Sequence, residues 1–129
     1  MQIFLSYTPT DSDFAHSLAR EMTDRGLRVW MPSTEILPGE NPWLRIGKAL
    51  ESSHALVVLL SPESVRSGLL QSELEYALGN ARFKGRIFPV LVRPTKNIPW
   101  ILQKFDLYDA KQTADKISAS IAQKLKRVA

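Results

Sequence analysis

Few side chains in this sequence could carry out chemistry, and the acidic residue Glu73 has the most suggestive position. The sequence has no cysteine and only two histidines, His16 and His54, which stand alone. It also lacks the G-x-x-x-x-G-K-[ST] and G-x-G-x-x-G patterns that cradle phosphates. These absences argue against a metal site, a Ser-His triad and a P-loop.

Glu73 belongs to the segment from about residue 67 to residue 80, which has the pattern of an amphipathic helix. The apolar stripe of this helix consists of Leu70, Leu74, Ala77 and Leu78. Glu73 falls on the neighbouring face, between Leu69 and Tyr76, so it should lie at the border of the core. Glu75 points elsewhere and should be solvated. Position alone favours a surface carboxylate near a helix N-terminus, and a reactive role needs further support.

Strand-like and helix-like segments alternate along the chain, which is typical of βαβ units around a parallel sheet. Short apolar runs predict strands at residues 2–7, 27–31, 54–60, 86–92 and 105–109. Helices are expected between a cap at Asp11 or Ser12 and Gly26, and at residues 42–52, 67–80 and 113–127. The second of these should turn Trp43, Ile46 and Leu50 inward. Residues 32–41 should be irregular, with a type II turn at Pro38-Gly39.

This pattern predicts one α/β domain over residues 1–129, a flavodoxin-like three-layer sandwich. Its five-stranded parallel sheet should have the order 2-1-3-4-5, with helices on both faces. The ligand crevice of such a sheet lies outside the carboxyl ends of the strands, between strands one and three. The loops at residues 6–9, 32–41 and 61–62 should converge there. The helix that carries Glu73 begins beside them.

Composition limits the class of protein and its partners. The apolar fraction of 44% and the charged fraction of 23% are those of a soluble globular domain. The longest apolar run, at residues 55–60, is far shorter than the roughly 20 residues of a membrane span, and the first residues have no signal-peptide pattern. The lack of cysteine fits a reducing compartment. We therefore expect a cytoplasmic domain without membrane contact.

Charge is distributed unevenly along the chain. Residues 1–81 contain 6 Lys/Arg and 10 Asp/Glu (net −4), whereas residues 82–129 contain 11 and 3 (net +8). No aromatic side chains alternate with these basic residues in a stacking pattern, so a nucleic-acid partner is not expected. The basic half fits a solvated face or a subunit contact.

Four segments of the chain match, in order and spacing, the sequence boxes of one family. Residues 4–7 (Phe-Leu-Ser-Tyr) with Asp11 match F-[IL]-S-Y-x-x-x-D, and residues 36–39 (Ile-Leu-Pro-Gly) are followed by Trp43. Residues 57–62 form an apolar strand with a Ser-Pro ending. These segments resemble the first box, the loop after strand two in bacterial members, and the third strand of the Toll/interleukin-1 receptor (TIR) domain. The resemblance extends from Gln2 to the terminal helix.

The fourth segment contains Glu73. Ser67, Glu73 and Leu74 match the S-x-W-C-x-x-E-L motif, whereas Leu69 and Leu70 replace its Trp and Cys. In addition, Pro32 replaces an Asp that is often found after strand two. The loop between Gly39 and Trp43 is one residue longer than in many members. These departures bear on nucleotide affinity and on the product rather than on the fold.

The resemblance implies an activity, because the catalytic branch of the family cleaves NAD+ at the nicotinamide–ribose bond and requires this Glu. It implies Glu73 as the catalytic residue, NAD+ as a substrate rather than a cofactor, and no metal. The implied substrate-binding residues are Tyr7, Thr8, Ile36, Leu37, Gly39, Trp43, Ser67 and Leu69. One carboxylate suffices, since nicotinamide leaves as a neutral ring and only the oxocarbenium-like ribose needs stabilisation. Water then yields ADP-ribose, and an intramolecular nucleophile yields a cyclic isomer.

The resemblance also implies partners and a setting. Homotypic TIR assembly into an oligomer or filament, a separate sensor or effector domain, and a role such as bacterial antiphage defence would follow from family analogy. The alternative from another class is a non-catalytic TIR scaffold, in which Glu73 is structural. A relative of the nucleoside deoxyribosyltransferases, which share a similar sheet and a catalytic Glu, fits the TIR boxes less well.

Overall fold

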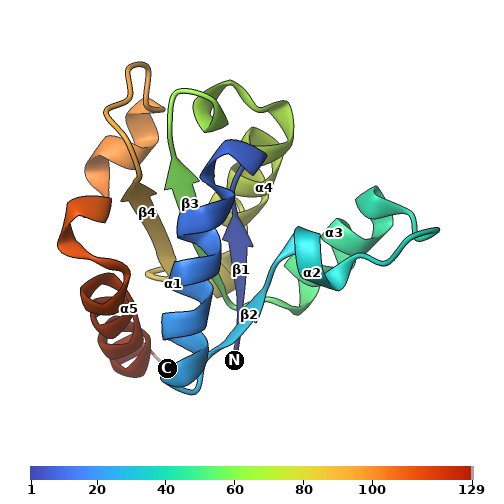
Figure 1. Ribbon diagram of the computed structural model, residues 1–129, viewed down its shortest axis with the longest axis horizontal. Helices are drawn as coiled ribbons and strands as arrows, with labels where there is room; N and C mark the ends of the chain where they lie inside the picture. Colours follow the sequence, from blue (N-terminus) through green and yellow to red (C-terminus); the bar gives the residue numbers. More distant parts are fainter. Residues whose placement is uncertain (129) are drawn as a thin grey trace.

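A five-stranded parallel sheet forms the centre of the molecule (Figure 1). The computed structural model describes residues 1–128. The strands are β1 (Gln2–Ser6), β2 (Arg28–Trp30), β3 (Ala55–Leu60), β4 (Ile87–Leu91) and β5 (Tyr108–Asp109). All neighbours pair in parallel, in the order β2-β1-β3-β4-β5. The predicted fold class and strand order are therefore confirmed.

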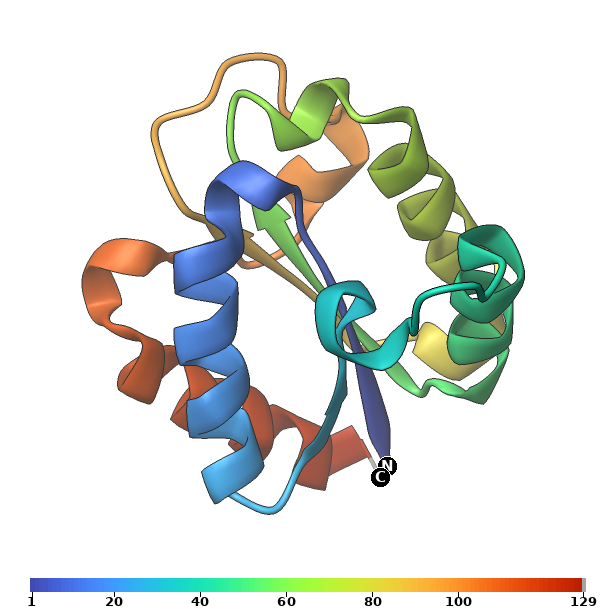
Figure 2. The same ribbon diagram turned by 45° about the vertical axis from the view of Figure 1, so that its right-hand side comes forward.

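Helices cover both faces of this sheet (Figure 2). The longer ones are α1 (Ser12–Asp24), α3 (Pro42–Ser52), α4 (Gly68–Leu78) and α5 (Ala114–Val128). The short ones are α2 (Pro32–Glu35) and the 3-10 turns η1 (Pro9–Asp11), η2 (Ser64–Arg66), η3 (Ala81–Phe83), η4 (Trp100–Lys104) and η5 (Ala110–Gln112). Helices α1 and α5 pack on one face, while α3 and α4 pack on the other. Within residues 1–128 we find no helix with the length and apolar character of a membrane span.

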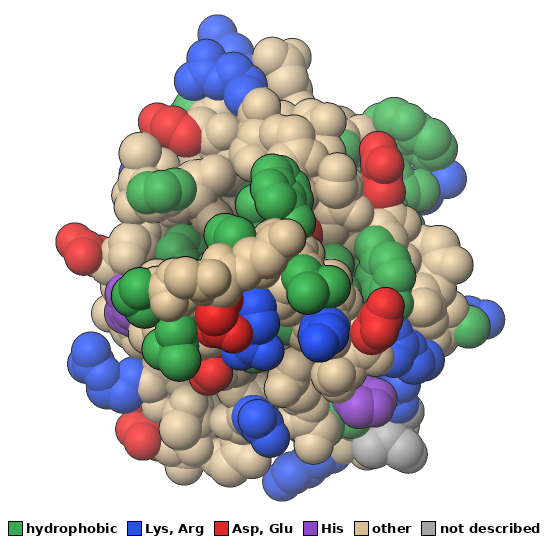
Figure 3. Space-filling view, turned by 90° about the vertical axis from the view of Figure 1, so that its right-hand side faces the viewer, with side chains coloured by type: hydrophobic (Ala, Val, Ile, Leu, Met, Phe, Trp, Pro, Cys, Tyr) green, Lys and Arg blue, Asp and Glu red, His purple; other side chains and the backbone are tan. Residues whose placement is uncertain are grey.

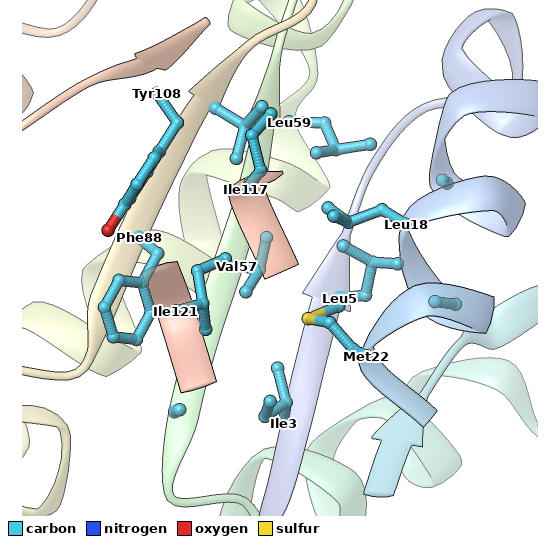
Figure 4. Close-up of a cluster of buried hydrophobic side chains, with 14 of the residues drawn as sticks. Ile3, Leu5, Leu18, Met22, Val57, Leu59, Phe88, Tyr108, Ile117 and Ile121 are labelled. Atoms are coloured by element: carbon cyan, nitrogen blue, oxygen red, sulfur yellow. The ribbon is translucent and has the colours of Figure 1, made fainter. Parts of the chain in front are cut away.

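The alternation of side chains along β1 divides the core into two halves. Ile3 and Leu5 point toward α1 and α5, where they join the cluster shown in Figure 4. Phe4 points toward α3 and α4 and stacks on Trp30, with ring centroids 5.0 Å apart. Strand β3 is buried at every position, as its unbroken apolar run predicts. The face toward which Phe4 points is also the face on which Ser6, two residues later, meets α4.

Three turn and cap predictions can be compared with the structure. Gly26, with φ +84°, follows the end of α1 as predicted. Gly39 has φ +89°, and the N–H of Glu40 donates to the carbonyl of Leu37 at 3.1 Å, which confirms the type II turn. Of the two predicted caps, Asp11 and Ser12, Asp11 occupies the N-cap position of α1, but its side chain accepts no hydrogen bond from an N–H of this helix. The turn η1 precedes α1 and directs this carboxylate toward the end of β3 instead.

Several helix predictions were also wrong in detail. Residues 32–41 are not wholly irregular, since Pro32 begins the short helix α2. Trp43 is 69% exposed, and Ala49 joins Ile46 and Leu50 on the inward face of α3. Trp43 lies in the first turn of α3. The segment of residues 32–44, which we call the arm, includes α2 and this first turn, and it projects away from the sheet (Figure 1). Leu78, at the end of α4, is 37% exposed and lies outside the core.

Candidate functional site

A cavity of about 550 Å³ opens beside the carboxyl end of β1. Its size is typical of small-molecule sites. Residues from η1, α1, α2, α3 and α4 line it: Tyr7, Pro9, Ser12, Pro32, Ser33, Ile36, Pro42, Ser67, Leu69, Leu70 and Glu73. In Figure 3, the side of the molecule with α2 and α3 carries separate hydrophobic groups among charged ones. The cavity lies at the carboxyl end of the sheet, where this strand order predicts a ligand-binding crevice.

Glu73 reaches this cavity because of how α4 begins. The Oγ of Ser67 accepts a hydrogen bond from the N–H of Leu70 at 3.2 Å and caps the helix. From this start, Leu70, Leu74 and Glu73 fall on the side that faces the sheet, and only 4% of Glu73 is exposed. The hydroxyl of Ser6 donates to Glu73 Oε1 at 2.6 Å. Glu73 thus joins α4 to β1 and lines the cavity as well.

The electrostatic state of Glu73 is unusual for a carboxylate. Burial raises its pKa from 4.5 to about 7, and the hydrogen bond from Ser6 opposes part of this rise. None of the ion pairs found within residues 1–128 includes Glu73. No ion pair therefore compensates the charge on this group, and near neutral pH both the protonated and the ionised forms of the carboxyl are populated.

A second buried carboxylate, Asp11, provides a direct comparison. Its Oδ2 accepts a hydrogen bond from the hydroxyl of Ser61 at 2.5 Å, and its Oδ1 lies 3.3 Å from Nη1 of Arg93. Arg93 also forms an ion pair with Glu63. This network links the carboxyl ends of β1, β3 and β4. Asp11 is thus held by both a serine and a cation, whereas Glu73 is held by a serine alone.

The structure brings together some of the residues expected at the site. Tyr7, Ile36, Ser67 and Leu69 line the cavity with Glu73. The other four lie outside its lining: Thr8, Leu37, Gly39 and Trp43. Thr8 bonds to the side chains of Thr10 and Asp11, and Gly39 forms the turn at the tip of the arm. Leu37 and Trp43 are 62% and 69% exposed on the same arm.

Six further lining residues were not among the expected binding residues: Pro9, Ser12, Pro32, Ser33, Pro42 and Leu70. Of these, Pro9, Pro32 and Ser33 lie in the loops at residues 6–9 and 32–41 that were expected to converge here, whereas residues 61–62 of the third expected loop are not part of the lining. The hydroxyl groups of Tyr7 and Ser33 lie 2.6 Å apart and connect the end of β1 to α2. Ser6 is the partner of Glu73; the period of two along β1 could have placed Ser6 on the same face as Phe4, but not against Glu73. Among residues 1–128, no three His, Cys, Asp or Glu side chains gather as a metal-ligand set.

Comparisons with known proteins concern the whole domain. The sequence model of the family described as "TIR domain" matches residues 3–125. The TIR domain of the Toll-related receptor TRR-2 from Hydra magnipapillata has a TM-score of 0.76 at 21% identity, over 97% of this chain and 94% of its own. A metazoan TIR-STING receptor from C. gigas, solved in complex with 2',3'-cGAMP, has a TM-score of 0.75 at 23% identity, over 92% of this chain and 38% of its own. At these identities the two structures support the fold.

Proposed function

This chain belongs to the TIR-domain family, and from that premise and the surroundings of Glu73 we propose that it cleaves NAD+ at the nicotinamide–ribose bond. The products are nicotinamide and either ADP-ribose or a cyclic ADP-ribose isomer. Glu73 is the catalytic residue of this proposal, and NAD+ is the substrate. No cofactor or metal is needed for the reaction.

One observation supports this proposal above the others, namely a buried carboxylate without a counter-ion at the edge of a cavity. A charged group in such a place is destabilised, because removing it from water costs several kcal/mol unless a partner compensates. A ligand with a positive charge supplies that partner. The nicotinamide ring of NAD+ is cationic, and the ribose becomes cationic as the bond breaks. Glu73 thus suits the cationic nicotinamide and ribose part of NAD+, whereas the described lining offers the anionic pyrophosphate no basic side chain.

The chemistry requires little from the protein. As the C–N bond breaks, its electron pair moves to the ring nitrogen, and nicotinamide leaves as a neutral molecule. The positive charge then resides on the ribose, where the ionised carboxylate of Glu73 stabilises it. Water bonds to the anomeric carbon and loses a proton, which gives ADP-ribose; an adenine nitrogen or a ribose hydroxyl in its place gives a cyclic isomer. Because the pKa of Glu73 is about 7, the rate should increase with pH through the neutral range.

Self-association is a second part of the proposal. Leu37, Trp43 and Leu44 are exposed on the arm beside the cavity, where a neighbouring copy could cover both the apolar side chains and the opening. We infer homotypic assembly into an oligomer or filament through this arm. A bacterial origin, a cytoplasmic location and a role in antiphage defence rest on family analogy.

A non-catalytic scaffold is the competing function, and one observation favours it. The partly protonated carboxyl of Glu73, bonded to Ser6, also suits a structural polar link between α4 and β1. The exposed arm would serve assembly in that case too. The enzyme and the scaffold differ in one expectation: removal of the charge at Glu73 should stop NAD+ cleavage by the enzyme, whereas the scaffold has no such reaction to lose.

The deciding experiment compares product formation by the wild type and two variants. Concentrated or clustered protein is incubated with NAD+, and nicotinamide and the nucleotide products are separated by chromatography. Glu73→Gln should abolish nicotinamide release while the protein remains folded. Glu75→Gln is the matched control, since it removes an exposed carboxylate two residues along the same helix. Equal activity in Glu73→Gln, or no release by clustered wild type, would reject the enzyme in favour of the scaffold.

A further inference from the structure

Ser6 occupies a position where the fold would otherwise place an apolar side chain. It is the last residue of β1 and pairs in register with Val58 of β3. Its side chain points to the same face as Phe4, which packs in the apolar cluster with Leu70 and Leu74 of α4. Ser6 itself is 1% exposed. A hydroxyl at this point is satisfied only because Glu73 accepts its hydrogen bond.

The hydrogen bond between these side chains fixes the carboxylate of Glu73. The Oγ of Ser6 lies 2.6 Å from Oε1, a short distance that is typical of a donor bonded to a charged acceptor. Within the part of the chain that the structure describes, no other side-chain donor bonds to this carboxylate. The glutamate side chain would otherwise have several rotamers available at the cavity wall. With Oε1 held against β1, Oε2 remains for a ligand.

We propose that Ser6 is a positioning residue for Glu73, which holds one carboxylate oxygen on β1 so that the other faces the ligand in the cavity. The catalytic meaning of this role rests on the proposed function, whereas the structural link does not. The geometry assigns Ser6 a second effect, because a hydroxyl that donates to a carboxylate stabilises its ionised form. Ser6 therefore also maintains the charge that the reaction uses.

The surroundings of Glu73 leave Ser6 as the principal local control on this charge. Among the lining residues that the structure describes, Glu73 and Tyr7 are the ones that can titrate, and none is Lys, Arg or His. Arg93 is engaged in a separate network, where it pairs with both Asp11 and Glu63. If the Ser6 hydroxyl is removed, no cation in the described lining can replace it in stabilising the ionised carboxylate of Glu73.

The test follows the titration of Glu73 directly and does not depend on turnover. Glutamate labelled with 13C at the side-chain carboxyl is incorporated, and the Glu73 signal is identified by its absence in Glu73→Gln. Two or three hydrogen-bond donors lower a carboxyl pKa by about two units. Loss of one donor in Ser6→Ala should therefore raise the titration midpoint of the Glu73 signal by about one pH unit. Ser6→Thr, which retains a hydroxyl, should restore the midpoint. Ser61→Ala is the matched control, because it removes a buried hydroxyl bonded to the other carboxylate, Asp11.

Activity gives a second readout. With the titration midpoint of Glu73 one pH unit higher, the ionised fraction of the free protein at pH 7 falls from about one half to about one tenth, so kcat/KM with NAD+ should fall about fivefold and recover above pH 8. Because a cationic ligand favours the ionised carboxylate, most of this change should appear in KM rather than in kcat. If Ser6→Ala does not fold, Ser6→Cys, with a similar size and a weaker donor, takes its place.

The outcomes separate this proposal from the proposed function. An unchanged midpoint in folded Ser6→Ala, or an equal shift in Ser61→Ala, overturns the positioning role. A shifted midpoint that Ser6→Thr restores supports it, even if the wild type releases no nicotinamide. In that last case the NAD+ reaction is rejected, and Ser6 remains the residue that sets the state of Glu73.

Discussion

Replacement of Glu73 by glutamine should make the protein more stable at alkaline pH than at acidic pH, relative to the wild type. The folded protein binds a proton at Glu73 with a pKa of about 7, whereas the unfolded chain releases it near 4.5. The stability that the neutral carboxyl contributes is therefore complete below pH 4.5, and it is lost as the pH rises through 7. Glutamine is always neutral and can still accept the hydrogen bond from Ser6. The variant should not show this loss.

The size of the effect follows from the two pKa values. The interval from 4.5 to about 7 corresponds to about 3 kcal/mol, at about 1.4 kcal/mol for each pKa unit. Solvent that reaches the carboxylate through the cavity would reduce this figure. Between pH 5 and pH 7 the wild type should lose stability relative to the variant by on the order of 1 kcal/mol per pH unit. Above pH 8 the difference should become constant.

Urea titrations at intervals between pH 4 and pH 8.5 measure this difference. The informative quantity is the change with pH in the free energy of unfolding of Glu73→Gln minus that of the wild type, because other titrating groups cancel in it. Glu75→Gln provides the baseline for an exposed carboxylate on the same helix. A Glu73→Gln difference that varies by less than about 1 kcal/mol over the whole range would refute the description of Glu73 as a buried carboxylate without a counter-ion.

Three further substitutions test other parts of the structure. Arg93→Ala leaves Asp11 buried without its cation and should lower the free energy of unfolding by about 2 kcal/mol. This is less than for a fully buried pair, because Arg93 is partly exposed. Urea titration measures the change, and an unchanged free energy of unfolding would show that the pair does not stabilise the fold. Gly39→Ala places a side chain at φ +89° and should destabilise the turn by about 1 kcal/mol. Sedimentation and turnover assays should then show weaker self-association and lower activity, whereas unchanged values would exclude the arm from the mechanism. Leu69→Trp adds an aromatic surface to the cavity wall and should lower KM for NAD+ roughly fivefold through about 1 kcal/mol of stacking; an unchanged KM would place the nicotinamide away from this wall.

The fold could be predicted well because its signals are local. Apolar runs and helical periods identify β1 to β4 and the four long helices, and the alternation of strands and helices fixes a parallel sheet. β5 is shorter than the expected segment 105–109, since Phe105 still caps the 3-10 turn η4 and only Tyr108 and Asp109 pair with β4. An edge strand of two residues leaves too short a pattern to delimit.

The site could be predicted only in part, because side-chain partners lie far apart in the sequence. The spacing around Glu73 places it on the correct side of α4, but nothing local indicates that Ser6, 67 residues earlier, bonds to it. Asp11 has the sequence position of a helix cap, yet it bonds to Ser61, which is 50 residues away. Trp43 satisfies the helical period but lies where α3 extends beyond the sheet. Periodicity predicts which face of a helix or strand is buried, whereas the hydrogen-bond partner of a side chain depends on how distant elements pack together.

The carboxyl of Glu73 makes the proton a competitor of any cationic ligand in the cavity. At pH 7 a group with a pKa of about 7 carries its proton about half of the time. A ligand that prefers the ionised form must displace this proton, so binding should release about half a proton per site at neutral pH and almost none above pH 9. Calorimetric binding heats measured in buffers of different ionisation enthalpy would reveal this release. Acidification of the surroundings would then weaken ligand binding by mass action, without any change in the shape of the protein.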